Sequence, residues 1–164
     1  MTDLQQMQAQ LQRLTDLEAI RTLRYRYAYL ANVVDGQLGD AEAFASLFCV
    51  DGVLDFGMGQ ARGREEIASM LRAAAVDWQC AMHYMLNPVI DLQGDEAEGQ
   101  VSGLFAFTTQ ARPQPVWFSN LYEDQYVRTD GDWQFRMVRV RTTFVDPAVV
   151  EAYTALWGNP GDPG

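Results

Sequence analysis

The chain has 164 residues, a formal net charge of −10 and a hydrophobic content of 48%. This length suits one domain with a sizeable core, and this hydrophobic content excludes a disordered chain. The negative charge argues against nucleic acid and anionic membranes as partners, because both require a basic surface. No apolar run is long enough to span a bilayer, and the N-terminus lacks the pattern of a secretory signal.

The residues that usually hold metals and cofactors are sparse. The sequence contains one histidine and two cysteines, Cys49 and Cys80, which lack the CxxC spacing. A structural zinc site is therefore not expected, and two reduced cysteines are typical of a cytoplasmic protein. The glycine-rich fingerprints of dinucleotide and phosphate binding do not occur. The sequence predicts a protein that uses neither a cofactor nor a metal.

One long amphipathic helix is predicted near the N-terminus. Thr15 and Glu18 have the spacing of a capping box, after a Gln-rich and weakly helical stretch over residues 2–14. Apolar residues then recur every three or four positions as far as Val34. Asp35-Gly36 is expected to end the helix, because glycine readily adopts the left-handed conformation found there.

In the rest of the chain, helices alternate with a strand at first, and the apolar pattern then changes from helical spacing to that of strands. A helix over residues 40–48, a strand over 50–56 and a helix over 63–75 are followed by four strands, over about 80–92, 97–108, 116–128 and 133–145. A short helix from Pro147 and a Gly/Pro tail over 158–164 complete the chain. This order predicts a single α+β domain over residues 1–157, with a curved antiparallel or mixed sheet wrapped around the N-terminal helices and a central pocket.

The stretch CAMHYMLNPVID, from Cys80 to Asp91, contains the only histidine, His83. Its imidazole titrates near neutral pH, so it is the first candidate for a proton-transfer group. The apolar, β-favouring residues around it place His83 on a strand with one face inside the protein. Two interpretations stay open: a core histidine satisfied by a neighbour, or a base that faces a cavity.

Asp35 is the candidate partner of His83. A carboxylate is unfavourable at the C-terminal end of a helix, where the macrodipole is negative. One explanation is that the Asp-Gly pair simply makes a turn. The other is that the acid orients an imidazole, because the carboxylate of an Asp–His pair fixes the tautomer and stabilises the imidazolium.

Further residues are candidates for the wall of the pocket. Tyr27 lies on the apolar stripe of the first helix, either as a hydrogen-bond donor to a substrate oxygen or as a core tyrosine. By strand parity, Arg139 and Arg141 share the face of Trp133 and Phe135, where an arginine needs an acid or an anionic group beside it. An adaptable apolar lining is offered by Met58, Met85, Phe105 and Trp117, which core packing alone would also use.

The chain from about Leu14 to Val145 resembles the SnoaL-like branch of the NTF2-like superfamily. The similarity rests on four stretches: DLEAIRTLRYRYAYLANVVDG from Asp16 to Gly36, LFCVDGVLDF followed by GREEI, HYMLNPVIDLQGD, and YEDQYVRTDGDWQF. The resemblance implies a cone-shaped α+β fold. Within the branch the chain looks most like three lyases: scytalone dehydratase, bile-acid dehydratase and hexachlorocyclohexane dehydrochlorinase.

In those lyases an Asp near the end of helix one and a His on the following sheet form the catalytic dyad, and Asp35 and His83 match them. The helix-one tyrosine of the family is matched by Tyr27, and its pocket arginine by Arg139 or Arg141. Three positions depart from the lyases. Leu30 stands where the dehydrochlorinase has a lysine, Phe105 or a neighbour stands where the bile-acid dehydratase has a further acid, and the second histidine of scytalone dehydratase is missing.

The expected function is that of a cofactor-independent lyase, of the dehydratase or dehydrohalogenase type, acting on a hydrophobic small molecule. The alternatives are an enzyme like ketosteroid isomerase or a polyketide cyclase with the same dyad, and a non-catalytic ligand-binding or assembly module. The resemblance also implies a homo-oligomer, a trimer or a dimer, formed through the convex face of the sheet. Apolar residues on both faces of the strands, such as Val116, Trp117 and Phe118, agree with this.

Overall fold

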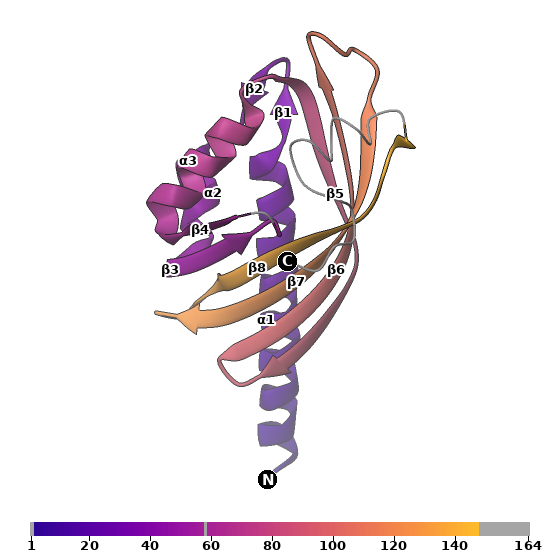
Figure 1. The fold of residues 1–164 in the computed structure, drawn as a ribbon. Helices are drawn as coiled ribbons and strands as arrows, with labels where there is room; N and C mark the ends of the chain where they lie inside the picture. The colour runs from indigo at the N-terminus through magenta and orange to yellow at the C-terminus, as the bar shows by residue number, and fades with distance from the viewer. Residues whose placement is uncertain (1, 58, 148–164) are drawn as a thin grey trace.

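The computed structural model describes residues 2–57 and 59–147. Three helices are packed into the hollow of one strongly curved sheet, as Figure 1 shows. The helices are α1 (Asp3–Ala31), α2 (Ala41–Ser46) and α3 (Gly63–Ala75). The strands are β1 (Val33–Val34), β2 (Gln37–Leu38), β3 (Phe48–Asp55), β4 (Gln60–Arg62), β5 (Trp78–Gln93), β6 (Glu96–Thr109), β7 (Val116–Thr129) and β8 (Asp132–Val145).

The strands form one mixed sheet in the order β2-β1-β5-β6-β7-β8-β3-β4. The pairs from β5 to β8 are antiparallel, whereas β3 lies parallel to β8. The predicted α+β architecture, a curved mixed sheet around N-terminal helices, is confirmed. The predicted helix from Pro147 and the tail over 158–164 lie outside the described residues.

The first helix starts and ends earlier than the sequence pattern predicts. It begins after Thr2, which forms a full capping box with Gln5, and it runs without a break through Thr15. The hydroxyl of Thr15 donates to the backbone oxygen of Leu11 at 2.9 Å, so Thr15 lies inside the helix rather than at its cap. The helix ends at Ala31 with Asn32 as its C-cap.

The residues after Asn32 form a small hairpin, whereas the sequence pattern predicts helix as far as Val34. Val33 and Val34 favour the extended conformation because their side chains are branched at Cβ, and Val34 pairs with Gln37 across a two-residue turn. Asp35 and Gly36 make that turn, with φ angles of 52° and 72°. Asp-Gly is a preferred pair for such a turn, because both central residues need a positive φ.

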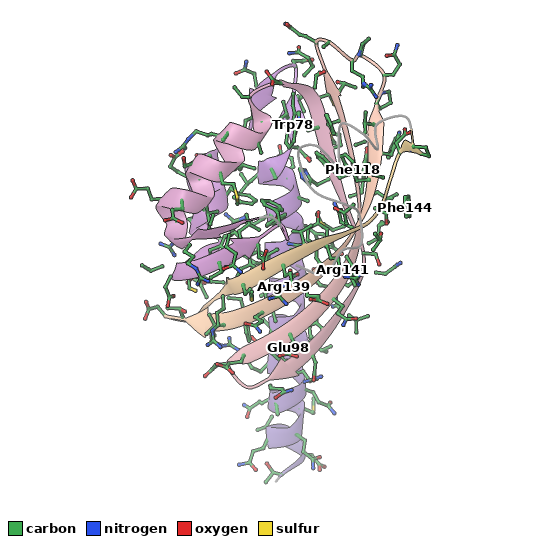
Figure 2. All side chains as sticks on the ribbon, in the orientation of Figure 1. Trp78, Glu98, Phe118, Arg139, Arg141 and Phe144 are labelled. Atoms are coloured by element: carbon green, nitrogen blue, oxygen red, sulfur yellow. The ribbon has the colours of Figure 1, made fainter. Side chains whose placement is uncertain are left out.

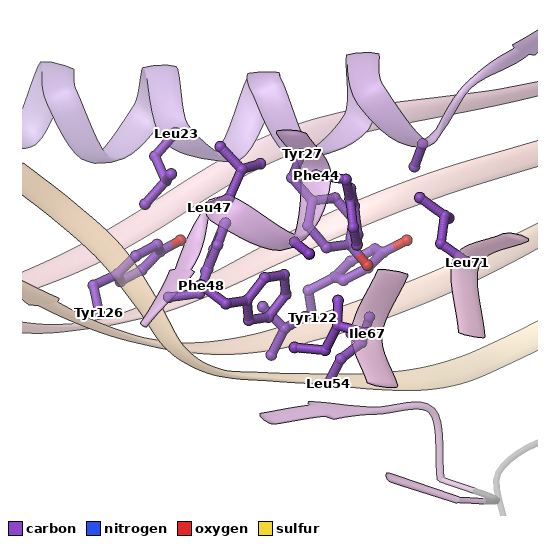
Figure 3. Packing of buried hydrophobic residues seen from close by; sticks show 14 of the residues in the cluster. Leu23, Tyr27, Phe44, Leu47, Phe48, Leu54, Ile67, Leu71, Tyr122 and Tyr126 are labelled. Carbon is purple, nitrogen blue, oxygen red and sulfur yellow. The ribbon is translucent and has the colours of Figure 1, made fainter. Parts of the chain in front are cut away.

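The core lies between α1 and the concave face of the sheet. Tyr27 of α1 packs against Phe44 of α2, with ring centroids 4.7 Å apart, and against Phe135 of β8 at 5.8 Å. Figure 3 shows this packing, with side chains from α1, α2, β3 and β7 meeting in one cluster. A second hydrophobic cluster is built around Phe105 and Phe118.

A bulge in β8 decides which of its side chains face the core. Tyr126 pairs with Phe135 and the preceding Gln125 pairs with Met137, so Arg136 is one extra residue in the strand. An extra residue reverses the alternation of faces beyond it. Phe135 and Val138 are therefore both buried, although simple parity would put them on opposite faces.

Candidate functional site

A cavity of about 540 Å³ opens between α1, α3 and the concave face of β5–β8. Eight aromatic side chains make up much of its wall: Tyr27, Phe44, Phe56, Trp78, Phe105, Phe107, Phe118 and Tyr122. The polar groups in the wall are few: Asp77, His83, Thr109, Asn120 and Thr142. A mainly apolar cavity with a few polar groups is typical of small-molecule sites.

His83 faces this cavity from β5 and is held by Asn32 at the end of α1. The side-chain Oδ1 of Asn32 accepts a hydrogen bond from the backbone N–H of His83, with a nitrogen–oxygen distance of 2.8 Å. The same oxygen lies 3.2 Å from Nδ1 of the imidazole. Because this Asn32 atom accepts from a backbone N–H, it is the amide oxygen and cannot donate. The proton between it and the imidazole therefore belongs to Nδ1 of His83. The other ring nitrogen, Nε2, is left with a free lone pair and has no partner among the described residues.

The surroundings of His83 keep its imidazole neutral. Burial lowers its pKa from the ordinary 6.5 to about 3, and the positive charge of Arg24 contributes in the same direction. The Asn32 amide is uncharged and does not oppose this effect, whereas a carboxylate in its place would stabilise the imidazolium. At neutral pH His83 therefore presents an acceptor to the cavity rather than a charge.

The structure does not bring Asp35 to His83. Asp35 is exposed in the turn between β1 and β2, and the partner of the imidazole among the described residues is Asn32. The reason is the early end of α1, which places its C-cap residue, Asn32, beside His83. The sequence pattern did not indicate Asn32, because an acid is the usual partner of a catalytic histidine and because Asp35-Gly36 is also a good helix end.

Tyr27 lines the cavity, and Tyr122 of β7 lies beside it with a ring-centroid distance of 6.2 Å. In Figure 3 the hydroxyls of these two tyrosines point the same way, toward Leu71 of α3. Burial raises the pKa of Tyr27 and of Tyr122, so both hydroxyls stay protonated donors. Nearby, the Thr142 hydroxyl donates to the side-chain oxygen of Asn120 at 3.0 Å. The sequence pattern did not single out Tyr122 or Asn120, because buried strand residues of these types are common.

A buried cation lies behind the two tyrosines. The guanidinium carbon of Arg24 is 4.3 Å from the ring centroid of Tyr27 and 4.1 Å from that of Tyr122. Its Nε lies 3.4 Å from Oδ2 of Asp124, and both side chains are almost fully buried. Asp124 also accepts a hydrogen bond from the Tyr126 hydroxyl at 2.7 Å. None of the guanidinium nitrogens has a hydrogen bond among the described residues, so the carboxylate of Asp124 and the faces of the two tyrosines compensate its charge.

The predicted lining residues divide between the cavity and other places. Phe105 lines the cavity, and its ring centroid is 4.5 Å from that of His83. Trp117 is 43% exposed and does not contribute to the wall. Met85 is partly buried against the main core cluster instead. Met58 lies outside the described residues.

Arg139 also lies outside this cavity. Its guanidinium pairs with Asp55 at 3.4 Å and with Glu123 at 4.0 Å, and half of its side chain is exposed. The bulge at Arg136 reverses the parity of the strand, so Arg139 and Arg141 face away from the core that Phe135 enters. Figure 2 shows both arginines along β8, whereas Trp78 lies near the end of α3.

The described residues contain neither a metal-binding cluster nor a membrane-spanning helix. Across residues 2–57 and 59–147, no group of three or more His, Cys, Asp or Glu side chains is placed to hold a metal ion. Within the same residues, no helix combines the length and the apolar character needed to cross a membrane.

The sequence of this cavity-bearing fold matches one family over most of its length. The model of the SnoaL-like domain covers residues 12–139. This chain belongs to the SnoaL-like domain family. The family predicted from the sequence is thereby confirmed, and no curated protein matches the SnoaL-like chain.

Solved structures of similar fold agree with this assignment. An NTF2-like protein with a cystatin-like fold from Novosphingobium aromaticivorans is 26% identical, with a TM-score of 0.74, covering 90% of this chain and 95% of its own. A hexachlorocyclohexane dehydrochlorinase from Novosphingobium barchaimii is 22% identical, with a TM-score of 0.73, covering 84% and 93%. A type 2 enzyme of the same name is 20% identical, with a TM-score of 0.74, covering 84% and 92%. At this identity the two dehydrochlorinases show the shared fold.

Proposed function

We propose that the SnoaL-like chain is a cofactor-independent lyase or isomerase that removes a proton from a hydrophobic small molecule. The observation that carries the proposal is the arrangement of His83. Asn32 holds its Nδ1, which leaves Nε2 as a free acceptor in an aromatic cavity. The dehydrochlorinases of the same fold support elimination as the type of reaction.

The residues around His83 suit a substrate with an oxygen next to the acidic carbon. As the proton moves to Nε2, negative charge develops on that oxygen, and the hydroxyls of Tyr27 and Tyr122 are donors that could bind it. The buried guanidinium of Arg24 adds a positive field behind them. Loss of a neighbouring hydroxide or halide would complete an elimination, and return of the proton to another carbon would complete an isomerisation.

The base in this proposal is weaker than a carboxylate-supported histidine. Asn32 fixes the tautomer, but its neutral amide does not stabilise the imidazolium that forms. The reaction therefore requires a substrate whose proton is already acidic, such as one next to a carbonyl group. Aromatic walls and a volume of about 540 Å³ favour ligands with one or more rings.

The test is turnover of a panel of hydrophobic β-hydroxy ketones, hydroxysteroids and halogenated cycloalkanes. General-base catalysis typically contributes about 10²–10⁴-fold, so His83→Ala should lower the rate by at least that factor. Asp35→Asn is the matched control, because Asp35 is exposed in the turn and should leave the rate unchanged. A substrate that is turned over equally well by His83→Ala would overturn the assignment of the base.

The second candidate function is binding of a hydrophobic ligand without turnover. The observation that favours it is the low pKa of His83, which keeps the imidazole a neutral hydrogen-bond acceptor and makes it a poor base. Native mass spectrometry of the purified chain would detect a retained ligand. Binding that is weakened by His83→Ala, without conversion of any bound compound, would support this function over the enzymatic one.

A further inference from the structure

The N-terminal half of α1 carries apolar side chains that nothing in the described chain covers. Leu4, Met7, Leu11 and Leu14 are 64–66% exposed. They follow one another at three, four and three residues, so they lie on one face of the helix. We call these four residues the leucine stripe.

The leucine stripe lies on a part of α1 that extends past the sheet. Figure 1 shows the N-terminal end of the helix projecting beyond the lower edge of β5–β8. Arg13, near the point where the helix meets the sheet, donates from its guanidinium to the backbone oxygen of Leu92 at 3.3 Å. An isolated helical segment of about 12 residues is marginal in water, so this extension needs a packing partner.

A groove begins where the leucine stripe ends. It has a volume of about 780 Å³ and runs beside α1, with Leu14, Glu18 and Thr22 on one wall. Residues 46–47 and 132–134 form the opposite wall. Leu14 belongs to both features, so the stripe and the groove form one continuous surface along α1.

We propose that this surface binds a second copy of the same chain, with the two α1 helices antiparallel and a two-fold axis near Leu11 and Leu14. In this arrangement Leu11 of each copy meets Leu14 of the other. Leu4 and Met7 of each copy then reach the partner's groove beside Glu18 and Thr22. Such an interface uses the same patch twice and is therefore closed.

Charge and size favour a second copy over an unrelated partner. Residues 3–14 carry one acid and one base, Asp3 and Arg13, whereas the whole chain has a net charge of −10. Two copies therefore meet through a segment that does not repel itself, and antiparallel helices also align their dipoles favourably. The stretch from Leu4 to Arg26 is about 33 Å long. The leucine stripe alone spans only two heptads. With the groove included, we expect the contact area to approach the roughly 800 Å² per partner of a standard interface.

The test is the mass of the full chain in solution, measured by light scattering at micromolar concentration. Leu11→Glu puts a charge at the centre of the proposed interface and should halve the mass of the assembly. Ala9→Glu adds the same charge two residues away, on the opposite face of the helix, and should leave the mass unchanged. A wild-type monomer, or equal masses for the wild type and Leu11→Glu, would overturn the proposal.

A cross-linking experiment separates loss of contact from loss of folding. In a Cys80→Ser background, which removes the exposed thiol, the double variant Leu11→Cys with Leu14→Cys should form a disulfide-linked dimer under mild oxidation, because these two positions face each other across the proposed interface. Ala9→Cys in the same background should stay monomeric on a non-reducing gel. Equal cross-linking of the two variants would show that the contact is not made through the leucine stripe.

Discussion

At the scale of single residues, Asn32 sets the chemistry of His83. An amide occupies the place beside the imidazole where the family resemblance implied an acid, and the acid that the sequence offers lies in an exposed turn. His83, Tyr27 and Phe105, which the sequence pattern singles out, line the cavity. The sequence could not indicate Asn32, because the partner of His83 depends on the residue at which α1 ends. Asn32 and Asp35 lie within one helical turn of each other, and a sequence pattern does not locate a helix end that closely.

The first prediction concerns Asn32→Asp. The new carboxylate would stabilise the imidazolium, so the pKa of His83 should rise. In the wild type the rate should stay level from about pH 5 to pH 9, because the imidazole is neutral throughout this range. In Asn32→Asp the rate should rise with pH through the new pKa, and its plateau should exceed the wild-type rate. Level pH–rate profiles for both proteins would contradict this account.

The second prediction concerns stability at low pH. The pKa of His83 is lower in the folded chain, at about 3, than in the unfolded chain, at about 6.5. Between these values the unfolded state binds a proton that the folded state does not, so stability falls as the pH falls. His83 should lower the free energy of unfolding by up to about 2 kcal/mol between pH 6.5 and pH 5.

Urea unfolding at both pH values, compared between the wild type and His83→Gln, would measure this contribution. The variant lacks the imidazole, so its loss of stability should be smaller by that amount. Equal losses in the two proteins would mean that the imidazole is protonated in the folded chain as readily as in the unfolded one.

At the scale of elements, the glycines of β6 shape the cavity wall. A Cβ added at Gly103 would lie 2.6 Å from Cε2 of Tyr122. The ring of Tyr122 therefore depends on the bare backbone of the neighbouring strand for its position. A sequence pattern shows only a glycine inside a strand and does not reveal which ring lies over it.

The third prediction follows from this contact. Gly103→Ala should force Tyr122 to shift and should lower the free energy of unfolding by about 1–3 kcal/mol, as overpacking does. Ligand affinity should fall as well, because Tyr122 lines the cavity. Gly59→Ala is the control, since nothing lies within 4 Å of the added atom. Thermal unfolding of the wild type, Gly103→Ala and Gly59→Ala would test this. An unchanged stability of Gly103→Ala would contradict the prediction.

The fourth prediction concerns the link between α1 and β7. Arg24→Met leaves the carboxylate of Asp124 buried without its cation, which typically costs about 3–5 kcal/mol. The double variant Arg24→Met with Asp124→Leu removes both charges and should recover most of this loss. Denaturant unfolding of the single and double variants would measure it. A double variant as unstable as the single one would mean that packing, not charge, is the main contribution.

At the scale of the whole molecule, the long strands made the fold predictable. Four strands of 14–16 residues with clear turns between them could be located to within two residues at each end. The short hairpin of β1 and β2 and the bulge at Arg136 could not. One extra residue in β8 turns Arg139 outward, although simple alternation assigns it to the face of Phe135.

The fifth prediction concerns the outer face of the sheet. Large apolar residues on β5, β7 and β8 are exposed: Tyr84, Leu86, Val89, Trp117 and Phe144. Cover by another subunit is expected there, in a trimer or a dimer, in addition to the contact through the leucine stripe. Trp117→Glu should lower the assembly mass independently of Leu11→Glu, and light scattering of both single variants and the double variant would test this. If the assembly mass of the double variant equals that of Leu11→Glu alone, the outer face of the sheet has no role in assembly.

The presence of a single histidine makes the cavity visible to spectroscopy. With one imidazole in the chain, a nitrogen-15 spectrum contains one pair of ring signals, which directly reports the tautomer and the charge of His83. The backbone amide of the same residue donates to the same Asn32 oxygen as the ring. Its chemical shift should therefore change together with the ring signals when a ligand reaches Nε2. Titration with small compounds would then locate binders without any assay of turnover.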